Sequence, residues 1–139
     1  MTNKLNCIML VDDNPHDNFF HERAISQYNP AIKVLKMESA VDALEYLKSH
    51  SEPIQLEPDI IFLDINMPYM NGWEFLEEYK KLDERIKQHF IIVMLSTSDH
   101  PTEKDMAANN GVISDFITKP LTKEILAVLN TRFFGDTQA

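Results

Sequence analysis

Three short apolar runs constrain the fold of this chain most strongly. They are CIMLV at 7–11, IIFL at 60–63 and FIIVML at 90–95, and none of them alternates between apolar and polar residues. Strands that expose one face to water alternate, whereas strands covered on both faces are apolar throughout. These runs therefore predict the buried centre of a parallel sheet that carries helices on both faces.

Five strands are expected in all. The three central ones span 5–11, 59–65 and 90–95, and the others span 32–37 and 115–118. The run at 32–37 alternates, which indicates a position near an edge of the sheet.

Helical patterns separate the strands. Helix starts are indicated by Asn14-Pro15, Ser39, Asn71-Gly72 and Pro101, and the last helix is expected at 121–134. The expected inner faces are Val41, Ala43, Leu44 and Leu47 in the second helix, and Leu121, Ile125, Val128 and Leu129 in the last. The alternation of strand and helix predicts an α/β fold, a flavodoxin-like doubly wound five-stranded parallel sheet in the order 2-1-3-4-5 with five flanking helices.

Length and charge narrow the functional classes. The 139 residues predict one domain over 1–139, with its core at about 5–134 and a tail at 135–139. A net charge of −9 disfavours nucleic acid and anionic membranes as partners, because their phosphates would be repelled. No apolar run has the length of a membrane span and no signal peptide is evident, so we expect a cytoplasmic protein.

Polar residues follow four of the predicted strands, where the ligands of open α/β sheets bind. Asp12 and Asp13 follow the first strand, and Asp64 closes the third. Ser96 follows the fourth strand and Lys119 the fifth. Each feature alone is ordinary, since an Asp-Asp pair is commonly a solvated turn. Their joint position predicts that all five side chains converge on one pocket.

Such a pocket suits phosphoryl chemistry. Clustered carboxylates repel one another unless a cation is bound, and an all-oxygen site favours Mg²⁺ or Mn²⁺ over zinc. Lys119 and Ser96 would add a positive charge and a hydroxyl donor for phosphoryl oxygens. One carboxylate would then be free to act as a nucleophile and form an acyl phosphate.

The motifs VDD at 11–13, LDINMP at 63–68 with NG at 71–72, VMLS at 93–96 and FITKP at 116–120 resemble those of response-regulator receiver domains. The resemblance covers about 5–134. It implies that Asp64 is the phosphoacceptor and that Mg²⁺ is held by Asp13 directly, by Asp12 mainly through water, by Asp64 and by the backbone carbonyl of Asn66. It gives Ser96 and Lys119 the roles of the hydroxyl and the lysine that contact the phosphoryl group.

The resemblance also implies a switch. Phe116 stands at the family's switch aromatic, where the ring turns inward as Ser96 moves toward the phosphoryl group; a permanently buried core ring is the alternative. The family more commonly has tyrosine there, and the gap from Gly111 to Phe116 is one residue longer than usual. The segments at 48–58 and 80–88 are also longer than usual.

The expected function is a stand-alone receiver. It would take a phosphoryl group from a histidine kinase or a histidine phosphotransfer protein, and signal to an unknown protein target through the fourth helix, fifth strand and fifth helix. It would catalyse only its own phosphorylation and dephosphorylation. Two alternatives are a phosphorylation-independent interaction module and a Mg²⁺-dependent phosphatase of the haloacid-dehalogenase type. The phosphatase needs an aspartate two residues after its nucleophile, where this chain has Asn66.

Overall fold

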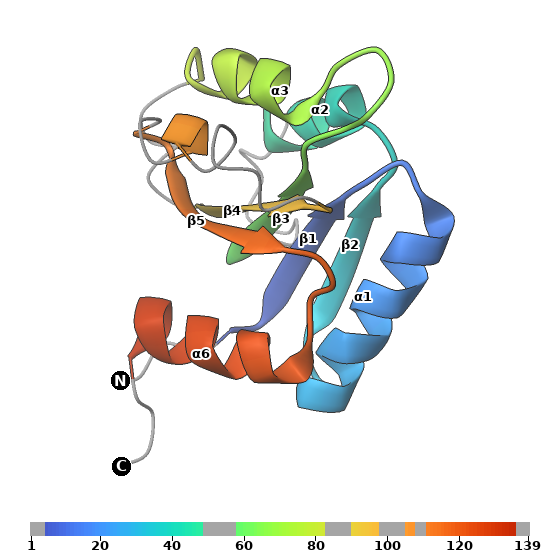
Figure 1. Ribbon diagram of the computed structural model, residues 1–139, viewed down its shortest axis with the longest axis vertical. Helices are drawn as coiled ribbons and strands as arrows, with labels where there is room; N and C mark the ends of the chain where they lie inside the picture. Colours follow the sequence, from blue (N-terminus) through green and yellow to red (C-terminus); the bar gives the residue numbers. More distant parts are fainter. Residues whose placement is uncertain (1–4, 49–57, 83–89, 98–104, 108–110, 136–139) are drawn as a thin grey trace.

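The computed structural model describes residues 5–48, 58–82, 90–97, 105–107 and 111–135. Five parallel strands form one sheet in the order β2-β1-β3-β4-β5, as Figure 1 shows, so the predicted strand order is confirmed. The strands are β1 (Cys7–Val11), β2 (Lys33–Met37), β3 (Ile60–Asp64), β4 (Ile91–Ser96) and β5 (Ile113–Thr118).

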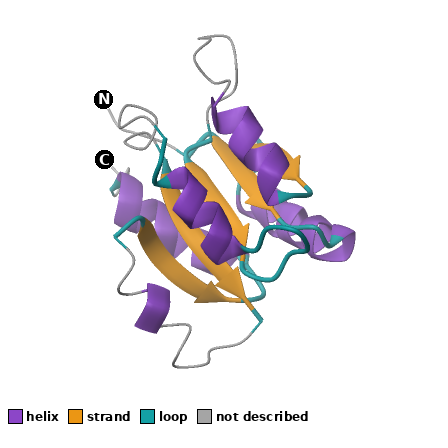
Figure 2. Ribbon diagram, turned by 90° about the horizontal axis from the view of Figure 1, so that it is seen from above, coloured by secondary structure: helices purple, strands orange, loops and turns teal. Residues whose placement is uncertain are grey.

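Helices cover both faces of the sheet (Figure 2). They are α1 (Pro15–Tyr28), α2 (Ala40–Lys48), α3 (Gly72–Tyr79) and α6 (Lys123–Phe134), and α1 packs beside α6 while α2 packs beside α3. Residues 105–107 are helical within the fourth expected helix, whose remainder from Pro101 lies outside the described residues, as do most of 48–58 and 80–88. Among the helices described, none combines the length and the apolar character needed to cross a membrane.

The ends of the helices follow their capping residues. The Asn14 side chain accepts hydrogen bonds from the backbone N–H groups of His16 and Asp17 at the start of α1. Asn71 and Glu74 form a reciprocal capping box that starts α3. Thr122 caps α6, which therefore begins two residues later than predicted.

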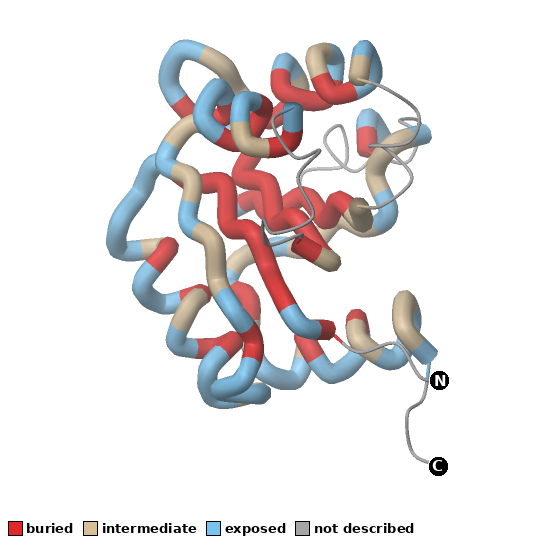
Figure 3. Tube along the Cα trace, turned by 180° about the vertical axis from the view of Figure 1, so that it is seen from behind, coloured by how far each residue is buried: buried red, intermediate tan, exposed pale blue. Residues whose placement is uncertain are grey.

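Burial separates the central strands from the edge strand β2. Every residue of β1 and β3 is buried, whereas β2 is only partly covered, as predicted for an edge (Figure 3). The predicted inner face of α6 was partly wrong, because Val128 is 58% exposed while Leu126 and Leu129 are buried. Val128 lies two positions from Leu126 and so points about 200° around the helix from it. In α2, Ala40 is buried in place of Val41.

A bulge shifts the register between β4 and β5. Ile92 pairs with Ile113, but the next residue, Val93, pairs with Asp115, so Ser114 is the extra residue. β5 consequently starts two residues before the predicted position. The bulge accommodates the additional residue between Gly111 and Phe116 and leaves Ser96 in register with Thr118, next to Lys119.

Candidate functional site

The carboxyl edge of the sheet collects the candidate residues. Asp12 follows β1, Asp64 ends β3 and Ser96 ends β4, and all three are buried. Lys119 follows β5, and its backbone N–H donates to the Ser96 carbonyl over 2.7 Å. Parallel strands end at the same edge, so four separate segments of the chain meet there.

Three carboxylates and one lysine form the centre of the site. Oxygen atoms of Asp12, Asp13 and Asp64 all lie within 4.8 Å of one another, and Asp13 is the exposed member. The Lys119 Nζ lies 3.0 Å from Asp12 Oδ2 and 3.1 Å from Asp64 Oδ1. The structure thus brings together four of the predicted residues around one point.

Local hydrogen bonds hold Asp12 in place. Its Oδ1 accepts from the backbone N–H of Asn14 over 2.9 Å, and its Oδ2 accepts from Lys119. Its backbone carbonyl accepts from the Asn18 side-chain amide over 2.9 Å. The start of α1 and Lys119 therefore fix the orientation of Asp12.

The environment of Asp64 disfavours its charge. Burial, and after it the negative charge of Asp12, raises the pKa of Asp64 to about 6, although Lys119 opposes the shift. Such a carboxylate gains from a nearby cation, because the cation relieves the repulsion that the fold imposes.

Lys119 has a third acidic neighbour, Asp17, which was not among the predicted site residues. The Asp17 Oδ2 lies 2.7 Å from the Lys119 Nζ. Burial alone would lower the pKa of Lys119, but hydrogen bonds to Asp17 and Asp12 and the charge of Asp64 raise it overall. Asp17 lies in the first turn of α1, the helix that begins two residues after Asp13, and this proximity to the acidic pair was the available sequence signal.

His21 is a second residue near the site that was not predicted from the sequence. It lies on the buried side of α1, four residues after Asp17. Burial and the charge of Lys119 lower its pKa, while Asp12 and Asp17 act in the opposite direction. A lowered pKa favours a neutral imidazole beside the charged cluster.

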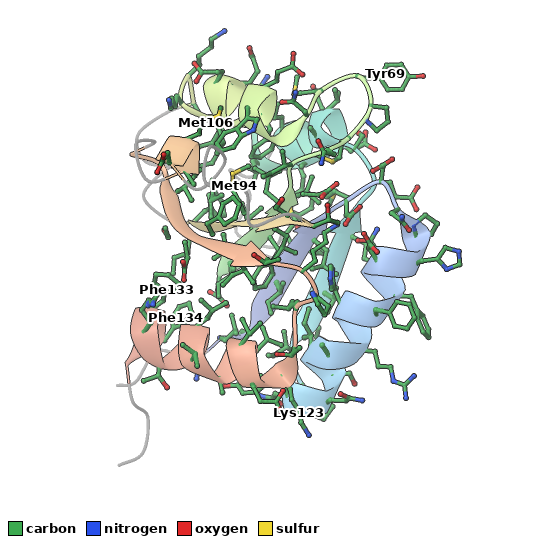
Figure 4. The ribbon with its side chains drawn as sticks, in the orientation of Figure 1. Tyr69, Met94, Met106, Lys123, Phe133 and Phe134 are labelled. Atoms are coloured by element: carbon green, nitrogen blue, oxygen red, sulfur yellow. The ribbon has the colours of Figure 1, made fainter. Side chains whose placement is uncertain are left out.

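The loop between β3 and α3 follows Asp64 directly, and its end at Gly72 packs against the backbone of Asp64 and Ile65. Asn66 is exposed in this loop, and Tyr69 points away from the protein with its side chain fully exposed (Figure 4). The Gly72 N–H donates to the Ile65 carbonyl over 2.8 Å. A Cβ at Gly72 would lie 2.8 Å from the Asp64 carbonyl oxygen, so only glycine fits without displacing the backbone of the site.

The two expected switch residues lie on neighbouring strands. Ser96 is 1% exposed at the end of β4. Phe116 pairs in register with Met94 and is partly buried against the hydrophobic cluster that contains Met94. The Phe116 ring is therefore neither sealed in the core nor free in solvent.

The donor set fits a small hard cation. The acidic cluster offers carboxylate oxygens only, and Mg²⁺ takes one or two carboxylates together with waters and phosphate oxygens. Lys119 supplies a fixed positive charge beside the same carboxylates. Together these groups can stabilise the charge of a phosphoryl group in transfer.

Comparisons with known proteins agree with this geometry. The response regulator receiver domain family matches residues 8–130. The two-component response regulator ORR1 of Oryza sativa subsp. japonica is 32% identical over 126 residues, which are 88% of this chain and 53% of that protein, so the chain spans about half the length of this relative. Protein PilH of Pseudomonas aeruginosa is 29% identical over 119 residues, covering 86% of this chain and 89% of PilH. The crystal structure of a two-component response regulator from Cytophaga hutchinsonii superimposes with a TM-score of 0.86 at 27% identity, covering 96% of this chain and all of that one.

Proposed function

This chain belongs to the response regulator receiver family, and on that premise we propose that Asp64 accepts a phosphoryl group in a Mg²⁺-dependent reaction. Phosphorylation of an aspartate is general in the family. The observation that carries the proposal is the position of Asp64, which is buried at the end of β3, 3.1 Å from the Lys119 ammonium and next to Asp12.

The proposed reaction moves one phosphoryl group. An Asp64 oxygen forms a bond to phosphorus while the bond from phosphorus to the histidine nitrogen of a kinase or phosphotransfer protein breaks, and that nitrogen keeps the electron pair. Lys119 neutralises oxygens of the transferring group, and Ser96 donates its hydroxyl to one of them. Bound Mg²⁺, held by Asp13, Asp64 and the Asn66 carbonyl with Asp12 acting through water, would neutralise the remaining charge.

The proposed output is a protein–protein contact rather than catalysis on another substrate. Coupling between Ser96 and Phe116 would change the surface formed by β5, α6 and the helical residues at 105–107. We further propose that the chain works as a stand-alone single domain, which the near-complete coverage of PilH supports. Capture of binding proteins with and without an acyl-phosphate mimic would identify its kinase and its downstream target.

Uptake of label from acetyl phosphate tests the proposal. The parent protein should form a stoichiometric acyl phosphate that requires Mg²⁺ and is labile to hydroxylamine. Asp64→Asn should take up no label, because the neutral amide is a poor nucleophile. Asp59→Asn is the matched control, since it makes the same change at the opposite end of β3, and it should label normally.

Other outcomes favour the alternatives. A hydroxylamine-resistant phosphoprotein would place the phosphoryl group on a residue such as Ser96. Multiple turnover of varied phosphate esters would indicate a phosphatase, and the absence of any labelling would indicate an interaction module that does not use phosphorylation.

A further inference from the structure

Lys119 is fully engaged by three carboxylates. Its Nζ lies 2.7 Å from Asp17, 3.0 Å from Asp12 and 3.1 Å from Asp64. Two of the three N–H donors of the ammonium hydrogen-bond to Asp17 and Asp12, and Asp64 lies at ion-pair distance. A phosphoryl oxygen that approaches Lys119 must therefore compete with carboxylates that already contact its ammonium.

Asp17 differs from the other two carboxylates. Asp12 and Asp64 follow or end strands of the sheet, whereas Asp17 lies in the first turn of α1 and its side chain is 34% exposed. Asp17 nevertheless makes the shortest contact with Lys119. Its negative charge draws the ammonium toward α1 and is also close enough to oppose a second anion at the same lysine.

We propose that Asp17 is a positioning residue that restrains Lys119 and thereby limits how firmly this lysine engages a phosphoryl group on Asp64. The inference rests on the proposed function. The strands of the sheet position Asp12 and Asp64, while α1 supplies Asp17, a separate carboxylate that restrains the position of Lys119. Loss of the Asp17 charge leaves the ammonium paired with Asp12 and free to follow the phosphoryl oxygens.

A purely structural role for Asp17 is the competing explanation. An acidic residue in the first turn of a helix interacts favourably with the helix dipole, and the Asp17 N–H also bonds to the Asn14 cap. A structural role predicts a lower melting temperature for Asp17→Asn but no selective change at the phosphoryl site.

The test uses beryllofluoride, an acyl-phosphate mimic, titrated by NMR into the full chain at saturating Mg²⁺. Asp17→Asn should bind beryllofluoride about three- to fivefold more tightly than the parent, a change in the range of a single partly exposed ion pair. Glu22→Gln is the matched control, since it also removes one charge from α1 but from an ion pair with Lys36, and it should leave the affinity unchanged.

Two further measurements separate the explanations. In a Lys119→Met background, Asp17→Asn should change the affinity for beryllofluoride less than twofold, because the lysine that transmits the effect is gone. Mg²⁺ alone should bind Asp17→Asn no more tightly than the parent, because a negative charge has been removed. This Mg²⁺ titration tests the inference even if Lys119→Met binds no beryllofluoride.

The outcomes are distinct. Equal tightening in both backgrounds, tighter Mg²⁺ binding, or an unchanged or weaker affinity for beryllofluoride would overturn the role assigned to Asp17. A parent protein that neither binds beryllofluoride nor labels with acetyl phosphate would instead contradict the proposed function.

Discussion

Two aspartates at opposite ends of β3 have opposite relations to the fold. Asp59 precedes the strand, and its Oδ2 accepts backbone N–H groups from Asn6 over 2.7 Å and from Cys7 over 3.0 Å. Asp64 ends the strand, where it pairs with Lys119 but faces Asp12 and Asp13. Asp59 lies at the amino edge of the sheet, where the strands begin, and its hydrogen bonds join β3 to the start of β1. Asp64 lies at the carboxyl edge, where the strands end, and its neighbours disfavour its negative charge.

The difference shows where this protein gives up stability for reactivity. A carboxylate that accepts hydrogen bonds from backbone N–H groups has its negative charge stabilised, which makes it a weaker base and a weaker nucleophile. A buried carboxylate with acidic neighbours, whose pKa is raised to about 6, is a stronger base and gains by binding a cation or sharing its charge with a phosphoryl group. Removal of the charge of Asp59 and of Asp64 should therefore change the free energy of unfolding with opposite signs.

The largest expected effect is at Gly72, on the carboxyl edge. Gly72→Ala should lower the free energy of unfolding by about 2–3 kcal/mol, because the new Cβ would clash with the backbone of Asp64 and Ile65, and of its three close contacts only the Met94 side chain could move away. Urea unfolding measures this change. Gly111→Ala is the control, since a Cβ there meets nothing within 4 Å, and equal effects of the two substitutions would show that the loop yields without cost.

The next largest effect is a gain in stability when the charge of Asp64 is removed. The pKa of Asp64 is raised from 3.8 to about 6 by folding, so the folded state binds the proton more tightly than the unfolded state. The contribution of Asp64 to the free energy of unfolding therefore falls as pH rises from about 4 to 6, and it stays low above that range. Asp64→Asn should remove this loss and raise the free energy of unfolding at pH 7, without Mg²⁺, by on the order of 2 kcal/mol.

Urea unfolding of both proteins from pH 4 to pH 8 checks the sign. The difference between Asp64→Asn and the parent should grow from pH 4 to about 6 and then stay constant. Saturating Mg²⁺ should stabilise the parent more than the variant, because the parent has the additional carboxylate ligand. A pH-independent difference would mean that Asp64 is not destabilised by its charge.

A smaller effect of the opposite sign is expected at the amino edge. Asp59→Ala should lower the free energy of unfolding by about 1–2 kcal/mol, because two backbone N–H groups lose a charged acceptor at a partly exposed position. Differential scanning calorimetry measures the change. Glu45→Ala, on the exposed side of α2, should stay within about 0.5 kcal/mol of the parent. A gain in stability in Asp59→Ala would remove the contrast between the edges.

The sequence predicted most of this arrangement because its strongest signals are local and periodic. Unbroken apolar runs identify strands buried on both faces, and the strand order then places the residues after four strands at one edge. The extra residue between Gly111 and Phe116 was evident in the sequence, but its position as a bulge at Ser114 could not be predicted, because that depends on the pairing between β4 and β5. The exposure of Val128 was missed because Ile125 and Val128 have the same helical spacing as Leu126 and Leu129, and only packing against the sheet decides which pair is buried.

Asp17 was missed for a different reason. An acidic residue three positions after Asn14 has a sufficient local explanation as part of a helix start. Its contact with Lys119 joins residues 102 positions apart and depends on the path of the chain after β5. A residue with a satisfactory local role can thus carry a second, long-range one that periodicity does not reveal.

The smallest expected effect is the conformational coupling between the phosphoryl site at the carboxyl edge and the Phe116 ring. Phe116 is partly buried and lies beside Met94, two residues before Ser96, so a movement of Ser96 toward a phosphoryl group has a short path to the ring. Beryllofluoride with Mg²⁺ should therefore shift NMR signals of Phe116 and along 113–118, while the amides of Asn6 and Cys7 at the amino edge stay unshifted.

Ser96→Ala tests whether the hydroxyl carries that coupling. The variant should still bind beryllofluoride, because Asp64 and Lys119 remain, but the shifts at Phe116 should shrink by an amount corresponding to a coupling free energy of about 1 kcal/mol. Ser114→Ala, at the exposed bulge of β5, is the control and should keep the full response. If Ser96→Ala transmits the shifts undiminished, Ser96 and Phe116 are not a coupled pair. Phe116 is then better described as a fixed ring of the core. The two edges of the sheet would in that case differ in the environment of their carboxylates but not in conformational response to the phosphoryl mimic.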